Sequence, residues 1–168
     1  MSPQLPAPRS AGAYRIAVVC LGNICRSPMA EVVLSARVAD ARLADDVTVV
    51  SAGTGDWHVG EEMDDRAARL LAREGYDPTR HRAQQVPAAW LEVQDLVLAM
   101  DRQNLLDLRS LGAAVPERVR LFRDFDPDGG GEVPDPWSGG EPGFLDVLAM
   151  VERTSAALVD GLESILRR

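Results

Sequence analysis

Apolar residues follow two patterns along this chain of 168 residues: short continuous runs, and longer stretches in which they recur at helical spacing. The short runs are rich in Val, Ile and Leu and predict four buried strands, at residues 16–19, 47–51, 95–100 and 119–122. The spaced stretches predict helices over residues 28–36, 64–74, 102–111 and 144–165, with a short helical piece near residue 90. Because strands alternate with helices, the pattern predicts an α/β domain with a parallel sheet covered by helices on both faces.

Residues with strong end preferences mark where these helices start and stop. Pro28 is expected at the first position of the first helix, Gly75 just after the second, and Asp101 as the N-cap of the third. Residues 124–142 are rich in Asp, Gly and Pro and predict a long loop. Loops of this length in compact domains are usually functional, so this segment is a candidate part of the site.

The composition of the chain indicates a globular protein and argues against membrane-spanning and nucleic-acid-binding classes. Hydrophobic residues make up 46% of the chain and charged residues 26%, as in an ordinary globular domain, and no apolar run is long enough to span a membrane. The formal net charge of −8 argues against a nucleic acid partner. Residues 1–12 are Pro-rich and lack the apolar core of a secretory signal. We therefore expect a disordered tail over residues 1–12, one domain over residues 13–168 and a cytoplasmic location, with signal-less export left open.

The two cysteines of the chain, Cys20 and Cys25, lie five residues apart. They provide neither a disulfide framework nor enough ligands for a structural zinc site, and they fit a reducing compartment. The chain has two histidines, which make a poor metal site by themselves. We expect no metal and no cofactor.

The loop between the first strand and the first helix carries the candidate chemistry. It has the pattern Cys-X5-Arg, from Cys20 to Arg26, followed by Ser27. A helix N-terminus preceded by a loop with inward N–H groups forms a cradle for phosphate, and Gly22 and Asn23 tolerate the positive φ that such a loop needs. A guanidinium can bind two phosphate oxygens, and the same field favours a cysteine thiolate. The indicated reaction is attack of the Cys20 sulfur on phosphorus.

Residues 19–28, VCLGNICRSP, resemble the signature of the low-molecular-weight protein tyrosine phosphatases, most closely the bacterial, actinobacterial-type members. The resemblance extends over all but the first dozen residues. It implies a single three-layer domain with a four-stranded parallel sheet in the order 2-1-3-4. It also implies metal-independent hydrolysis of phosphotyrosine through a cysteinyl-phosphate intermediate, a tyrosine-phosphorylated protein as substrate, competitive binding of inorganic phosphate or vanadate, and a monomer.

The same resemblance assigns the general acid to Asp135, which stands between two prolines in the segment Pro-Asp-Pro-Trp. The neighbouring acidic residues Asp124, Asp126 and Asp128 are expected to be surface residues of the loop. The family commonly has Tyr, often followed by a second Tyr, where this chain has Trp137 and then Ser. We expect the aromatic wall to survive this change, whereas regulation by phosphorylation of those tyrosines cannot operate.

The remaining implied site residues bind phosphate, support the loop or form the pocket. Trp57 and Trp137 are the expected walls of a cleft deep enough to select phosphotyrosine over phosphoserine. A hydrogen-bond network is expected to hold the loop, with Ser27 Oγ donating to the Cys20 sulfur. The phosphate-binding and loop-supporting set is Leu21, Gly22, Asn23, Ile24, Cys25, Ser27, Ser51 and His81.

Cys25 has two interpretations that the sequence leaves open. It packs beneath the loop as a small residue, or it captures oxidised Cys20 as a reversible disulfide and protects it from further oxidation.

Two alternative functions fit the sequence less well than a phosphatase does. A thiol-coupled arsenate reductase on the same fold would need further cysteines to relay a disulfide, and none follows Cys25. A non-catalytic phosphotyrosine-binding module would be expected to lack the nucleophile or the acid, and both are present here.

Overall fold

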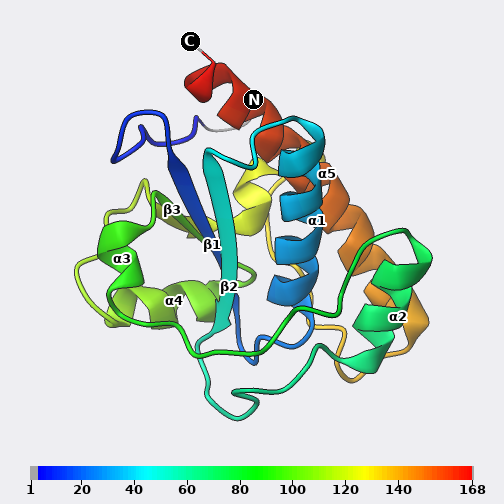
Figure 1. Ribbon diagram of the computed structural model, residues 1–168. Helices are drawn as coiled ribbons and strands as arrows, with labels where there is room; N and C mark the ends of the chain where they lie inside the picture. Colours follow the sequence, from blue (N-terminus) through cyan, green and yellow to red (C-terminus); the bar gives the residue numbers. More distant parts are fainter. Residues whose placement is uncertain (1–3, 168) are drawn as a thin grey trace.

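Four parallel strands form the centre of the molecule in the order β2-β1-β3-β4, so the predicted strand order is confirmed (Figure 1). The computed structural model describes residues 4–167. Each strand coincides with one of the predicted apolar runs. The strands are β1 (Tyr14–Cys20), β2 (Val47–Gly53), β3 (Leu96–Ala99) and β4 (Val119–Leu121).

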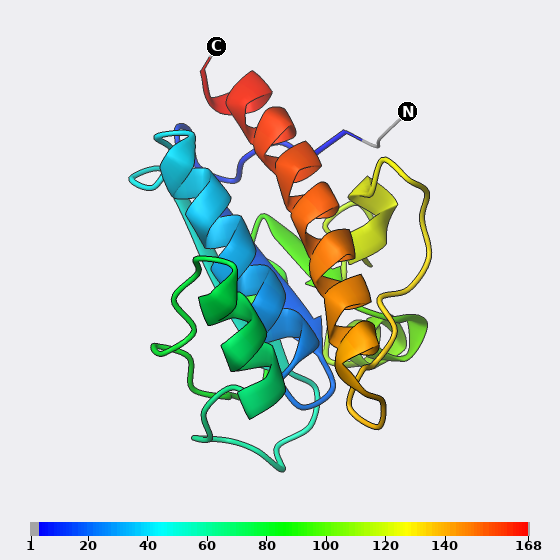
Figure 2. The same ribbon diagram turned by 90° about the vertical axis from the view of Figure 1, so that its right-hand side faces the viewer.

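Helices cover both faces of this sheet, which confirms the predicted three layers (Figures 1 and 2). Alternate residues of β1 point to opposite faces, so Ile16 and Val18 belong to one apolar cluster while Ala17 and Val19 belong to the other. The first face carries α1 (Arg26–Asp40), α2 (Asp65–Arg73), α5 (Glu141–Leu166) and the 3-10 turn η1 (Phe122–Phe125), and the second carries α3 (Trp90–Val93) and α4 (Arg102–Ser110).

Of the three residues predicted to mark helix ends, Asp101 and Gly75 do so and Pro28 does not, while α1 extends to Asp40 and α5 begins at Glu141, inside the predicted loop. Asp101 caps α4 in a capping box with Asn104, and Gly75 follows α2 with a φ of +91°. Helix α1 begins at Arg26, so Pro28 occupies the third helical position rather than the first. Proline is tolerated there because the first N–H groups of a helix have no intrahelical acceptor.

The N-terminal segment lies against the domain. The disordered tail was expected over residues 1–12, of which residues 1–3 lie outside the described residues. Arg9 donates its N–H to Asp95 Oδ1 at 2.6 Å, the Tyr14 hydroxyl donates to Pro6 O at 2.9 Å, and Leu5 packs on the core. In the structure the domain thus supplies partners for residues 4–12, and the disordered tail stays a prediction. The boundary at residue 13 stays a prediction.

None of the helices within residues 4–167 combines the length and apolar character needed to cross a membrane. The carboxyl ends of β1 and β2 and the N-terminus of α1 meet at one edge of the sheet (Figure 1). In a parallel α/β sheet this is the edge where ligands bind.

Candidate active site

Residues 20–26 connect the end of β1 to the start of α1 and contain a backbone conformation that few residues adopt. Asn23 has a φ of +58°, as expected for a loop of this kind. The φ of Gly22 is not in the left-handed region, so this position does not need the conformational freedom of glycine. Its size matters instead, since a Cβ there would lie 3.0 Å from Cδ2 of His58.

Most backbone carbonyl groups of this loop accept hydrogen bonds, whereas several of its N–H groups have no acceptor among residues 4–167. Carbonyl oxygens of the loop accept hydrogen bonds from residues outside it: Cys20 from Thr54 N, Leu21 from Gly55 N, Asn23 from His81 Nε2 and Ile24 from Asp64 N. The N–H groups of residues 22–25 donate to no acceptor in the described residues. Buried N–H groups are nearly always paired, so a row of four without partners is the arrangement expected for an anion site.

A chain of hydrogen bonds orients the hydroxyl of Ser27 toward the sulfur of Cys20. Gln84 N donates to Asn23 Oδ1 at 2.9 Å, so the other end of that amide is the –NH2 group, which donates to Ser27 Oγ at 2.8 Å and to Ser51 Oγ at 3.0 Å. Ser27 Oγ therefore accepts from Asn23 and keeps its own hydrogen. The Cys20 sulfur lies 2.9 Å from Ser27 Oγ, and the alternative acceptor, the carbonyl of residue 52, lies at 3.4 Å. The hydroxyl is thus oriented to stabilise a thiolate.

His81 supports the loop as a neutral residue. It is 6% exposed, and its Nε2 lies 2.7 Å from the carbonyl oxygen of Asn23. Since a carbonyl can only accept, the proton is on Nε2. Burial lowers the pKa of His81 below its usual value, although the bond to Asn23 acts in the opposite direction. This side chain is a structural donor to the loop.

Arg26 is buried and held by groups from two distant loops. Its Nη1 donates to Asp101 Oδ2 at 2.7 Å and to Val133 O at 3.0 Å, and its Nη2 lies 3.7 Å from Asp135 Oδ2. Burial acts to lower the pKa of Arg26, but Cys20 and the two carboxylates outweigh it and raise that pKa. The guanidinium stays charged where a phosphate would lie. The sequence identified Asp101 only as a helix cap, and its second role had no local signal.

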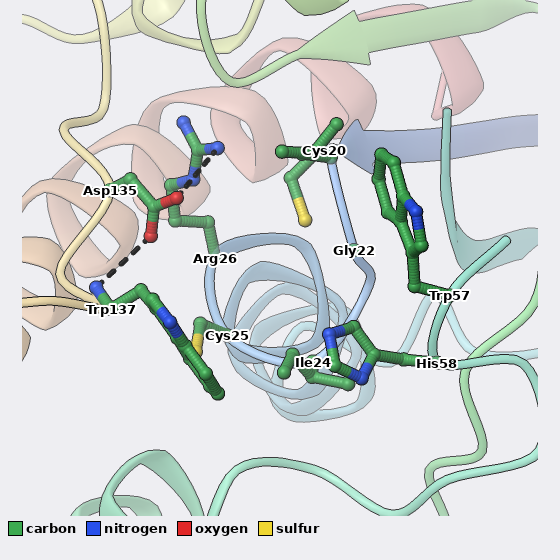
Figure 3. A pocket seen from close by; sticks show the side chains of 10 residues that line it. Cys20, Gly22, Ile24, Cys25, Arg26, Trp57, His58, Asp135 and Trp137 are labelled. Atoms are coloured by element: carbon green, nitrogen blue, oxygen red, sulfur yellow. Dashed lines mark hydrogen bonds and ion pairs between the residues drawn. The ribbon is translucent and has the colours of Figure 1, made fainter. Parts of the chain in front are cut away.

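Asp135 reaches the same cavity from the loop that precedes α5. Its Oδ1 accepts from the N–H of Trp137 at 3.0 Å, which leaves Oδ2 facing Arg26 (Figure 3). The expectation that Asp126 is a surface residue is wrong. Asp126 is 5% exposed and accepts bonds from Arg123 and Arg153. Although burial acts to raise the pKa of Asp126, these bonds lower it. A sequence shows the charge of such a residue but not the arginines folded around it.

The cavity at this edge has a volume of about 140 Å³. Trp57 and Trp137 stand on opposite sides of it, and the Cys20 sulfur lies deeper, between them and facing Arg26 (Figure 3). The two tryptophans are 68% and 50% exposed, so a large part of each ring is available to a ligand. The other residues along the cavity are Leu21, Gly22, Ile24, Cys25, His58 and Asp135.

Cys25 is the N-cap residue of α1 and is 5% exposed. Burial and nearby negative charges raise the pKa of its thiol far above the usual value. Both cysteines are free thiols. Cys25 is therefore protonated at neutral pH and is not the nucleophile.

One residue that the sequence analysis did not select is essential to the packing of the loop. A Cβ on Gly53 would lie 2.6 Å from the carbonyl oxygen of Leu21 and 3.1 Å from the N–H nitrogen of Asn23. Only glycine lets the end of β2 approach the loop this closely. Among residues 4–167, no three His, Cys, Asp or Glu side chains converge as ligands of a metal ion would.

Comparisons with known proteins agree with this geometry. The family model described as "Low molecular weight phosphotyrosine protein phosphatase" matches residues 15–167. The low molecular weight protein-tyrosine-phosphatase of Streptomyces coelicolor is 47% identical over 151 residues, which are 87% of this chain and 92% of that protein. A protein tyrosine phosphatase from Entamoeba histolytica superposes with a TM-score of 0.84 at 31% identity, over 90% of this chain and 98% of that one. The Drosophila arginine phosphatase superposes with a TM-score of 0.79 at 29% identity, over 88% and 97%.

Proposed function

Because this chain belongs to the low molecular weight phosphotyrosine protein phosphatase family and is therefore a protein tyrosine phosphatase, we propose that Cys20, Arg26 and Asp135 carry out its reaction. One observation carries the assignment. The Cys20 sulfur lies 2.9 Å from Ser27 Oγ, beside a loop in which the N–H groups of residues 22–25 have no acceptor within residues 4–167. A nucleophile, an oxyanion site and a carboxyl group thus line one cavity.

In the first step, the Cys20 thiolate attacks phosphorus and the bond from phosphorus to the tyrosine oxygen breaks. The loop N–H groups and Arg26 bind the phosphoryl oxygens, where negative charge is held in the transition state. Asp135, protonated, gives its proton to the leaving oxygen, so tyrosine departs neutral. The product is a cysteinyl-phosphate.

In the second step, water attacks the cysteinyl-phosphate and the bond between phosphorus and sulfur breaks. Asp135, now a carboxylate, takes a proton from that water. The departing sulfur regains its negative charge, which the hydroxyl of Ser27 stabilises at 2.9 Å. Inorganic phosphate is released, and we expect phosphate and vanadate to compete with substrate for the same loop.

The cavity walls favour an aryl phosphate over an alkyl one. Trp57 and Trp137 face each other across the opening, so a phenyl ring that carries a phosphate can lie between them (Figure 3). Since the structural relatives include an arginine phosphatase, phosphoarginine is the comparison substrate that matters. A planar guanidinium can also stack on an aromatic ring, so relative kcat/KM for phosphotyrosine and phosphoarginine peptides decides between them, and we expect phosphotyrosine to be preferred.

Assays of ester hydrolysis, ligand binding and arsenate reduction test the mechanism, with p-nitrophenyl phosphate as the standard substrate. We expect Cys20→Ser to abolish turnover while still binding phosphate or vanadate, and EDTA to leave the wild-type rate unchanged. Asp135→Ala should slow esters with weakly acidic leaving groups more than those with strongly acidic ones. Arsenate reduction coupled to a thiol, at a rate that matches or exceeds phosphate ester hydrolysis, would overturn the assignment in favour of a reductase. Binding without turnover in the wild type would favour a binding module.

The physiological setting follows from the same site. We expect the substrate to be a tyrosine-phosphorylated protein and the enzyme to act as a monomer. Two free thiols, one of them the nucleophile, fit the reducing conditions of the cytoplasm. A pull-down with Asp135→Ala, which should bind the substrate but cleave its phosphate ester slowly, is the direct route to that phosphoprotein.

Two roles for Cys25 remain to be distinguished: packing beneath the loop and protecting Cys20 from oxidation. As a redox partner it would attack a sulfenic acid on Cys20, release water and form a disulfide, with hydrogen peroxide as the oxidant. If it has this role, Cys25→Ala inactivated by peroxide recovers less activity with added thiol than wild type does. Equal recovery would leave packing beneath the loop as its function.

A further inference from the structure

Arg66, on the first turn of α2, contacts the loop that carries Asp135. Its Nη1 donates to the carbonyl oxygen of Gly139 at 3.2 Å. Its guanidinium carbon lies 5.4 Å from the ring centroid of Trp137 and 4.7 Å from that of Phe144. The planar group thus packs on the aromatic wall of the cavity and on the first turns of α5 while bonding the loop between them.

The other side of Arg66 is fixed to the phosphate-binding loop. Asp64 accepts from Arg66 Nε and Nη2, each at 3.2 Å, and from the Arg66 N–H at 2.9 Å. The N–H of Asp64 in turn donates to the carbonyl oxygen of Ile24 at 2.9 Å. A continuous path of hydrogen bonds therefore runs from Ile24 through Asp64 and Arg66 to Gly139.

Few other bonds hold this part of the chain. Within the described residues, the bond from Arg66 to Gly139 is the only hydrogen bond that joins residues 134–139 to the rest of the protein. The side chain of Asp135 is 47% exposed, and its nearest charged partner, Arg26, lies 3.7 Å away. The position of Asp135 over the cavity thus depends on how residues 134–139 are held.

We propose that Arg66 is a positioning residue that fixes residues 134–139 so that Asp135 lies over Cys20. The inference rests on the proposed role of Asp135 as the general acid. Arg66 acts through that carboxyl group and does not itself touch the phosphoryl group. A displacement of about 1 Å in a catalytic group can cost about 100-fold in rate, so a loosened loop is enough to impair proton transfer.

The test compares two esters, phenyl phosphate with a weakly acidic leaving group and 2,4-dinitrophenyl phosphate with a strongly acidic one. We expect Arg66→Ala to lower kcat/KM at least about 10-fold for the first and to leave the second nearly unchanged, because only the first needs the acid. Arg69→Ala is the matched control. It removes an equal charge from the same helix, and within residues 4–167 Arg69 has no bonding partner.

A double-mutant cycle shows whether Arg66 acts through Asp135. In the Asp135→Ala background, Arg66→Ala should cause no further loss with phenyl phosphate, because the acid is already gone. Arg66→Lys, which keeps the charge but lacks the planar fork, should lose rate with phenyl phosphate as Arg66→Ala does. It also serves as the test variant if Arg66→Ala does not fold.

Each contrary result has a distinct meaning. Equal losses with both esters, additive losses in the cycle, or a wild-type rate for Arg66→Lys with phenyl phosphate would overturn the positioning role and leave the proposed mechanism standing. If Asp135→Ala itself treats the two esters alike, the acid assignment fails, and the role of Arg66 fails with it.

Discussion

The substitution Asp101→Asn tests how the guanidinium of Arg26, the proposed phosphate ligand, is held. Both carboxylate oxygens of Asp101 are in use, since Oδ2 accepts from Arg26 Nη1 at 2.7 Å and Oδ1 accepts from Asn104 N at 2.8 Å. Asparagine has a single acceptor oxygen. If that oxygen keeps the helix cap, the new –NH2 group faces the guanidinium, donor against donor. The ion pair is lost while the cap remains.

The size of the effect follows from the burial of the pair. The side chains of Arg26 and Asp101 are 4% and 22% exposed, so solvent replaces the lost partner poorly. A hydrogen bond to a charged group contributes about 1.5–3 kcal/mol. If that energy positions Arg26 for the transition state, kcat/KM falls by about 10- to 150-fold. The full cost of about 3–5 kcal/mol for breaking a buried pair is not reached, because Val133 O still accepts from Arg26 at 3.0 Å.

The assay is kcat/KM for p-nitrophenyl phosphate, with the inhibition constant of inorganic phosphate and the free energy of unfolding measured on the same preparations. Asn is as good an N-cap as Asp, so we expect stability to change by less than about 1 kcal/mol. Asn104→Ala is the matched control. It removes the other half of the capping box, a 3.2 Å bond to the N–H of Asp101, and leaves the ion pair with Arg26 intact. This variant should be less stable and fully active.

Wild-type kcat/KM and phosphate affinity in a folded Asp101→Asn protein would refute the reasoning. Val133 and Asp135 would then be enough to position Arg26, and its buried ion pair with Asp101 would contribute nothing to the site. A parallel loss of activity in Asn104→Ala would also refute it, because the effect would then come from the start of α4.

Three further results are expected. Ser27→Ala removes the hydroxyl that lies 2.9 Å from the Cys20 sulfur. This variant should slow dephosphorylation of the cysteinyl-phosphate by about 10- to 100-fold and produce a burst of p-nitrophenol in rapid kinetics. An unchanged rate without a burst would contradict this role of Ser27. Gly53→Ala places a Cβ 2.6 Å from Leu21 O. Denaturant unfolding should therefore show a free energy of unfolding lower by about 1–3 kcal/mol. Stability equal to wild type would mean that the loop moves freely to accommodate the methyl group. The folded-state pKa of Asp126 is lowered, so the stability that this carboxylate contributes is present above its unfolded-state pKa of about 4 and is lost as pH falls through the folded-state value. The difference in free energy of unfolding between wild type and Asp126→Asn should therefore narrow on acidification. A difference that stays constant with pH would contradict the role of the ion pairs.

The sequence alone determined the elements and the chemistry that lie within short stretches of chain. Apolar runs and helical spacing predicted the strands and helices, and the segment from Cys20 to Ser27 identified the anion loop. Asp135 was found because two prolines and an aromatic residue surround it in a recognisable segment. The strands and helices were predicted correctly because hydrophobic periodicity and capping depend on neighbours within a few positions, whereas the roles of the loop residues and of Asp135 stay predictions.

Sequence reasoning was less successful where a residue's role depends on a distant part of the chain. Asp126 reads as a loop carboxylate, yet two arginines bury it. The role of Asp101 toward Arg26 spans 75 positions, and the contact of Arg66 with Gly139 spans 73. No spacing within a local window encodes such pairs.

Tertiary structure decided these matters because packing brings separate segments to one edge of the sheet. The order of the strands placed β2 beside β1, so that Gly53 meets the loop of Cys20 across a gap that only a hydrogen can fill. The reactive groups of the site therefore come mainly from one short segment, whereas the residues that orient them come from distant parts of the sequence. The side-chain types of Cys20 and Arg26 suit the proposed nucleophile and cation, whereas burial and hydrogen bonds between distant segments fix the orientation of these side chains.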